Sequence, residues 1–158
     1  MLQISNILVP IDFSERSANA FHLAAALARD HRAAMTLLHV RETPALPIAE
    51  FGAVPPADVP SHTEVVERLS RFEPADESVS IDYLVGDGLP AEEIVRVSQE
   101  RNCDLIVMGT HGRSGLGRLL MGSVAEEVVR KAPCPVLTLK APVAAVEPAE
   151  AEAAVQHA

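Results

Sequence analysis

The sequence contains no tryptophan, a single tyrosine and only two cysteines among its 158 residues. This shortage of aromatic rings, together with a formal net charge of -9, excludes a nucleic-acid surface that works by base stacking or by basic charge. Neither Cys103 nor Cys134 has a second cysteine or a histidine at metal-ligand spacing, so we expect no structural zinc site. We expect two free thiols in a reducing cytoplasm.

Long hydrophobic runs are also missing. No apolar run approaches the roughly 20 residues that a membrane-spanning helix needs, so no membrane span is expected. The first residues, Met1–Asn6, lack the basic region and the small-residue cleavage site of a secretory signal, which again predicts a cytoplasmic protein. Hydrophobic residues nevertheless make up 48% of the chain, which is enough for one domain with a single core.

Short apolar runs alternate with segments of helical periodicity. The apolar runs predict buried strands at residues 7–11, 34–40, 79–85, 104–108 and 136–139. Capping and first-turn residues predict helices that begin near Ser14, Ser61, Pro90 and Ser123. Together they predict an α/β fold, an open five-stranded parallel sheet of Rossmann-like type with helices on both faces. Ligands of such sheets bind where the strand order reverses, so we expect Asp12 and Gly109 to be neighbours.

Finer expectations concern the later elements. Gly86, Asp87 and Gly88 are turn-forming residues, so the third strand is expected to end at Val85. The helix after it is expected to bury Ala91, Ile94, Val95 and Ser98. The last helix is expected to bury Ala125, Val128, Val129 and Ala132.

Two segments fall outside the alternating pattern. Residues 41–60 hold five prolines, which are incompatible with a regular helix or a central strand, and they predict a mobile loop. This loop fits either a lid or a partner surface. Residues 141–158 form an acidic tail rich in Ala, Pro and Glu, without a clear amphipathic face. The predicted domain therefore spans residues 1–140.

The glycine-rich stretch from Gly109 to Ser123 joins a buried strand to a helix. Glycines let backbone N–H groups approach phosphate oxygens, and the helix N-terminus at Gly122 favours negative charge. The stretch lacks the lysine of a Walker-type loop, and no dinucleotide G-x-G-x-x-G pattern follows the first strand. Two interpretations remain open, a phosphate-binding loop and a flexible surface loop whose glycines only form turns.

The spacing Gly109-x2-Gly112-x9-Gly122-Ser123 resembles the G-2x-G-9x-G-[ST] nucleotide motif of the universal stress protein family. The agreement covers about residues 3 to 140 and includes Ile-Leu-Val-Pro-Ile-Asp at 7–12, Leu-Leu-His-Val at 37–40 and Cys-Pro-Val-Leu at 134–137. The resemblance implies a UspA-like domain with a fold similar to the adenine nucleotide alpha hydrolases. It further implies ATP binding, with Mg or Mn.

The resemblance also implies the residues of the site. The phosphates would be held by Gly109, Gly112, Gly122, Ser123 and the backbone amide of Val124. Ribose or phosphate would face His111 and Arg113, and the pocket would be completed by Pro10, Asp12, Met108 and the main chain of Val40, which would meet adenine. Independently, a carboxylate at Asp12 opposite a phosphate loop suits a divalent cation.

Other roles are open to several of these residues. Asp12 suits a cap of the first helix, and Met108 suits a packing role. His111 and Arg113 suit exposed loop positions. His39, on the second strand, is interpreted as a satisfied histidine of the core or its rim.

Three functions are compatible with these features. The favoured one is an ATP-binding module for stress response or signalling with slow hydrolysis at most, because no lysine stands in the phosphate loop. The alternatives are an ATP-dependent hydrolase or nucleotidyl transferase on the same fold, and a dimerisation or interaction module with an empty pocket. The apolar strand Val136–Leu139 is expected at an edge of the sheet, and the resemblance implies a homodimer through it. The sequence identifies no other protein partner.

Overall fold

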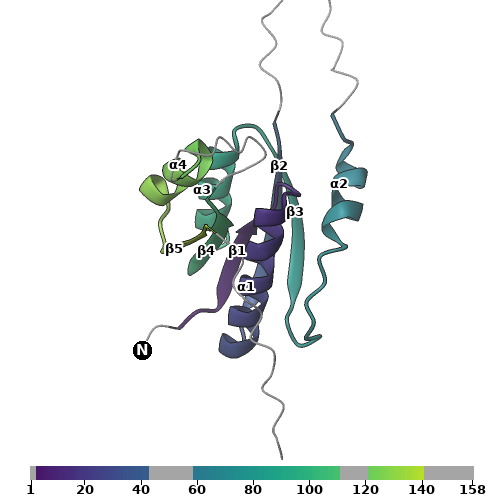
Figure 1. Cartoon of the computed structure of the whole chain (residues 1–158), viewed down its shortest axis with the longest axis vertical. Helices are drawn as coiled ribbons and strands as arrows, with labels where there is room; N and C mark the ends of the chain where they lie inside the picture. Colours follow the sequence, from purple (N-terminus) through teal and green to yellow (C-terminus); the bar gives the residue numbers. More distant parts are fainter. Residues whose placement is uncertain (1–2, 43–58, 111–120, 141–158) are drawn as a thin grey trace, which may run out of the picture.

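The computed structural model describes residues 3–42, 59–110 and 121–140 (Figure 1). Strands and helices alternate in the order β1 (Asn6–Pro10), α1 (Glu15–His31), β2 (Ala34–Arg41), α2 (His62–Leu69), β3 (Ile81–Asp87), α3 (Pro90–Glu100), β4 (Leu105–Gly109), α4 (Ser123–Lys131) and β5 (Val136–Leu139). None of the described helices combines the length and the apolar character that a membrane crossing requires. The predicted tail and most of the proline-rich loop lie outside the described residues.

All neighbouring strands of the five-stranded sheet are parallel, in the order β3-β2-β1-β4-β5. The order reverses between β1 and β4, which pair through Ile7 with Leu105 and Leu8 with Ile106. The predicted α/β class and parallel sheet are therefore confirmed. The reversal places the loops after β1 and β4 side by side at the carboxyl edge of the sheet, where ligands of such sheets bind.

Helices cover both faces of the sheet (Figure 1). Because side chains alternate along a strand, Ile7 and Val9 of β1 pack toward α1 and α2, whereas Leu8 packs toward α3 and α4. All three are almost completely buried, as a continuous apolar strand predicts. The first layer is centred on Phe21, Ala24, Leu37, Val65 and Val107, and the second on Leu38, Ile94, Val97, Ile106 and Val128.

The helix starts that the sequence predicts are confirmed. Ser14 caps α1 by accepting a hydrogen bond from the backbone N–H of Ser17. Ser61 and Glu64 form a complete capping box at the start of α2. Pro90 occupies the first turn of α3, and α4 begins at Ser123.

Some finer expectations were wrong. β3 runs to Asp87 rather than Val85, because it pairs with β2 as far as Arg41 and ends in an ion pair of 2.7 Å between Arg41 and Asp87. The turn follows at Gly88, whose φ of 131° suits glycine. In α3 the buried valine is Val97 and not Val95, since the face toward the sheet continues from Ala91, Ile94 and Ser98. In α4, Val129 is 46% exposed.

Candidate functional site

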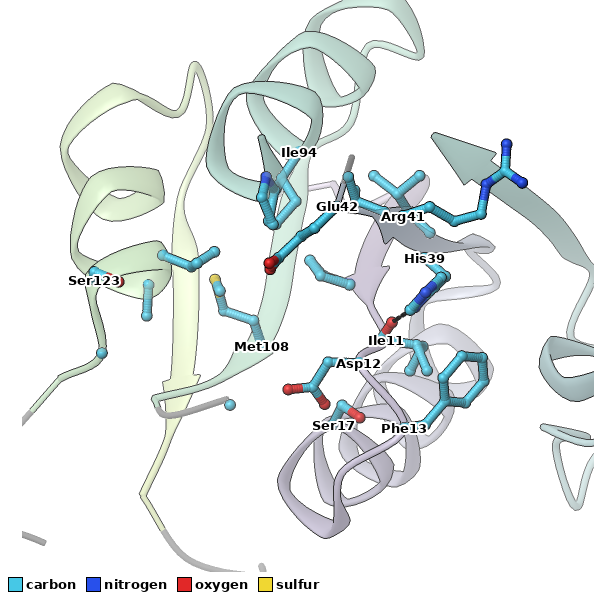
Figure 2. Close-up of a pocket in the computed structure, with 18 of the residues that line it drawn as sticks. Ile11, Asp12, Phe13, Ser17, His39, Arg41, Glu42, Ile94, Met108 and Ser123 are labelled. Atoms are coloured by element: carbon cyan, nitrogen blue, oxygen red, sulfur yellow. Dashed lines mark hydrogen bonds between the residues drawn. The ribbon is translucent and has the colours of Figure 1, made fainter. Parts of the chain in front are cut away.

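A cavity of about 560 Å³ opens at the carboxyl edge of the sheet. This volume is in the range of small-molecule binding sites. Most of its walls come from the loop after β1, the first turn of α1, the end of β2, the first turns of α3 and α4, and the end of β4 (Figure 2). Arg68 of α2 adds one further side chain. The cavity therefore lies at the strand-order reversal, where the sequence predicts the ligand.

The structure brings most of the predicted site residues to this one cavity. Its lining includes Pro10, Asp12, Val40, Met108, Gly109, Gly122, Ser123 and Val124. The remaining predicted residues, His111, Gly112 and Arg113, lie outside the part of the chain that the structure describes.

The first turn of α4 forms one end of the cavity. Gly122 is the N-cap residue in an extended conformation, with φ -76° and ψ 159°, and no side-chain hydrogen bond caps the helix. The N–H of Gly122 itself donates to the carbonyl of Thr110 at the end of β4. The following N–H groups, of Ser123 and Val124, belong to a first helical turn, in which N–H groups have no partner inside the helix. Such a turn attracts anions through its N–H groups and through the helix dipole.

Gly109 allows β4 and α1 to meet at this end. A Cβ atom at Gly109 would lie 3.0 Å from the Cβ of Arg16 and 3.3 Å from its carbonyl carbon. Such spacings are shorter than ordinary van der Waals contact, so a side chain here would push the start of α1 away. The close packing of β4 against α1 thus requires a glycine at this position, in addition to its place in the predicted phosphate motif.

Asp12 projects its carboxylate into the cavity from the loop after β1 (Figure 2). Its Oδ1 accepts a hydrogen bond of 2.9 Å from the backbone N–H of Ser14. Because the side chain of Ser14 caps α1, the alternative role of Asp12 as the helix cap is wrong. The described residues include no group of three or more His, Cys, Asp or Glu side chains that could hold a metal ion. A single carboxylate still suits Mg²⁺, which is commonly bound by one or two carboxylates together with the phosphates of a ligand.

The end of the cavity toward α2 is aromatic. The ring of His39 lies 4.7 Å from that of Phe13, and its Nδ1 is 2.7 Å from the carbonyl oxygen of Ile11. A carbonyl only accepts, so Nδ1 carries the proton. His39 is therefore the satisfied rim histidine that the sequence indicates. The guanidinium of Arg68 lies 3.8 Å from the centroid of Phe13, on its face. Sequence reasoning missed Phe13 and Arg68, because only the packing of α2 brings them together.

Charge is unevenly distributed around the cavity. Among the described lining residues the carboxylates are Asp12 and Glu42, and the guanidiniums are Arg41 and Arg68. Arg41 is turned outward, where it pairs with Asp87 (Figure 2). The described side chains at the α4 end, such as Thr110 and Ser123, are neutral. An anion at that end would therefore be held chiefly by backbone N–H groups rather than by the described side chains.

The model of the universal stress protein family matches residues 3–140 of the chain. The chain belongs to the universal stress protein family. Universal stress protein MJ0531 of Methanocaldococcus jannaschii is 35% identical to this universal stress protein over 139 residues, which are 86% of this chain and 82% of that protein.

Solved structures of other universal stress proteins share the fold. UspA of Lactobacillus plantarum superposes with a TM-score of 0.73 at 26% identity, covering 87% of this chain and 99% of that one. A universal stress protein crystallised in complex with cAMP gives a TM-score of 0.63 at 25% identity, covering 87% of this chain and 97% of that one. The family resemblance and the fold expected from the sequence are thus confirmed.

Proposed function

We propose that this universal stress protein binds ATP in the cavity and acts as a nucleotide-dependent module of stress response or signalling, with slow hydrolysis at most. The observation that carries the proposal is the first turn of α4, which has no side-chain cap and lines a cavity at the strand-order reversal. The related protein crystallised with cAMP supports an adenine nucleotide as the ligand class.

The shape of the cavity suggests how the nucleotide lies. Its phosphates meet Gly109, Gly122, Ser123 and Val124, where backbone N–H groups gather. Its base enters the apolar part of the cavity, which is lined by Leu38, Val40, Pro90, Ile94 and Met108, with the main chain of Val40 as the polar contact. Pro10 and Asp12 lie between these parts, and Asp12 shares a Mg or Mn ion with the phosphates. From the sequence, His111, Gly112 and Arg113 complete the phosphate end.

Binding is proposed rather than rapid turnover. Enzymes that transfer phosphoryl groups stabilise the developing charge with a lysine, an arginine finger or metal ions, and they position the nucleophile with a catalytic base or a water-orienting residue. No lysine stands between Gly109 and Ser123 in the sequence, and none lines the described walls of the cavity. We therefore assign the site to binding ATP without rapid hydrolysis. Other proteins would respond to whether ATP is bound.

The decisive experiment compares the wild-type protein with the Gly122→Val variant. The extended backbone of Gly122 accepts valine without strain, and the new side chain would fill the place of the phosphates. We expect Mg-ATP to raise the melting temperature of the wild-type protein and to leave that of the variant unchanged. The matched control is Ser80→Val, an exposed position that precedes β3 at the opposite edge of the sheet.

Two results would overturn the proposal. One is the absence of both a thermal shift with Mg-ATP and any nucleotide released when the purified wild-type protein is denatured. The other is an unaltered ATP affinity in a folded Gly122→Val variant. That result would show that the phosphates do not bind at the first turn of α4.

We also propose a homodimer through β5. This strand ends the sheet, and its Leu137 is 38% exposed, so it offers an apolar edge to a second copy. Leu137→Asp is expected to give a monomer by light scattering, whereas wild-type protein at micromolar concentration gives twice the monomer mass. A monomeric wild-type protein would contradict the proposal.

We base the proposal of a cytoplasmic location on the redox state of the two cysteines. Cys103 and Cys134 are both free thiols, which suits a reducing compartment. Fractionation of cells that produce the protein tests this location.

A further inference from the structure

Glu42 follows β2 directly and lines the cavity. Its side chain is turned inward, toward Asp12 and Met108, whereas that of its neighbour Arg41 is turned outward to Asp87 (Figure 2). Glu42 makes no hydrogen bond or ion pair with any other residue that the structure describes. Glu42 is an exposed residue, so its carboxylate lies at the open rim of the cavity, where both solvent and an entering ligand can reach it.

The pleat of β2 explains this orientation. Leu38 and Val40 pack on the side of the sheet that carries α3 and α4, and Glu42 continues the same alternation by two residues. Glu42 therefore lies at the rim of the apolar part of the cavity, next to Val40. In the sheet β2 is separated from β4 by β1, so Glu42 lies on the wall opposite the first turn of α4.

The chemistry of Glu42 restricts what it recognises. An ionised carboxylate only accepts hydrogen bonds, so it favours a ligand edge that presents N–H groups. The exocyclic amine of adenine carries two hydrogens. A 6-oxo purine presents an oxygen at the same place, which would face the carboxylate without a hydrogen between them. Asp12 is less suited to this task, because one of its oxygens already accepts from Ser14 and it stands nearer the proposed phosphates.

We propose that Glu42 selects the base, by accepting a hydrogen bond from the exocyclic amine of adenine and by repelling the 6-oxo group of hypoxanthine and guanine. The inference rests on the proposed function, since it takes a nucleotide in this cavity as given. It adds a side chain that determines specificity to a site otherwise described by backbone groups and apolar walls.

The test measures the affinities of Mg-ATP and Mg-ITP for wild-type protein and for Glu42→Gln. The two nucleotides carry the same charge, so any change in electrostatic repulsion cancels in the ratio of their affinities. A hydrogen bond to a charged group predicts a preference of about tenfold or more for ATP in the wild-type protein. In Glu42→Gln the amide can also donate to a 6-oxo group, so the preference should fall to within about threefold. Glu42→Ala, which lacks both groups, should lower the preference as well, to what the main chain of Val40 supplies.

Glu77→Gln is the matched control. Glu77 is exposed in the loop before β3, at the opposite edge of the sheet, and its substitution removes the same charge. This variant should keep the wild-type preference for ATP.

The outcomes separate the two proposals. Binding of ATP with a preference that falls in both Glu42 variants supports the inference. Binding of ATP with an unchanged preference overturns the role of Glu42 and leaves the proposed function standing. A loss of Mg²⁺ dependence with an unchanged base preference would instead make Glu42 a metal ligand and overturn base selection. No binding of ATP by the wild-type protein would overturn the proposed function and this inference with it.

Discussion

The guanidinium of Arg68 lies on the face of the Phe13 ring, 3.8 Å from its centroid. Phe13 follows Asp12 directly and has a φ of 63°, which is uncommon for a residue with a bulky side chain. Its ring also lies 6.3 Å from that of Phe72, just beyond α2. These contacts fix the loop after β1 against α2, and they hold Asp12 in its place at the cavity.

The pairing of Arg68 with Phe13 predicts an energetic coupling. A double-mutant cycle of Arg68→Gln and Phe13→Leu should give an interaction free energy of about 0.5–1 kcal/mol, as expected for a half-exposed cation on an aromatic face. Urea unfolding of the four proteins measures it. Strictly additive losses of stability would show that the two side chains touch without stabilising each other.

Gly109→Ala should destabilise the protein by about 1–3 kcal/mol, because the new methyl group meets the first turn of α1 at Arg16 and nothing there swings aside. Gly86→Ala is the matched comparison. Its methyl group would meet the carboxylate end of Glu93, 2.8 Å from Oε2, and a flexible side chain can move. Urea midpoints should therefore fall further for Gly109→Ala than for Gly86→Ala. Equal midpoints for the two variants would contradict the packing role of Gly109.

The sequence was sufficient to predict the layers of the fold and the location of the cavity. Continuous apolar strands such as Ile7–Val9 indicate burial on both faces, and the alternation with helices then implies a parallel sheet. The rule for ligand sites in such sheets led from these strands to Asp12 and Gly109, which do line one cavity.

Sequence patterns failed where tertiary contacts decide. Phe13 and Arg68 are 55 positions apart, and no periodicity relates them. Val95 and Val97 are both apolar residues of α3. Which of them is buried depends on how α3 is rotated about its axis against the sheet, and Val97 is the buried one. Glu42 was overlooked because it stands at the start of the proline-rich segment, where the pattern suggests a loop and gives no side-chain direction.

The capping box of α2 predicts a pH-dependent contribution to stability. Hydrogen bonds from Ser61 lower the pKa of Glu64 below its ordinary value of 4.5. Because the folded-state pKa is depressed, this stabilisation is complete above the unfolded-state pKa and is lost as the pH falls through the folded-state pKa. Glu64→Gln keeps the cap geometry without the charge. Wild-type protein should therefore melt above the variant at pH 7, and this difference should shrink as the pH falls below 4.5 and through the folded-state pKa of Glu64, as measured by circular dichroism. A difference that stays constant over this fall in pH would contradict the ionic character of the cap.

Burial predicts that Cys103 resists alkylation in the folded protein. Cys103 is 7% exposed as a residue, and burial, with a smaller contribution from Cys134, raises the pKa of its thiol to about 11. The thiolate is the reactive form, so at pH 8 the folded protein presents very little of it. Iodoacetamide followed by peptide mass spectrometry should find Cys103 unmodified in the native protein and modified in guanidinium chloride. Cys134, whose pKa burial also raises, is only half-buried and should react first. If Cys103 reacts as fast in the native protein as in the unfolded chain, the layer between the sheet and α3 and α4 must open readily at this end of β4.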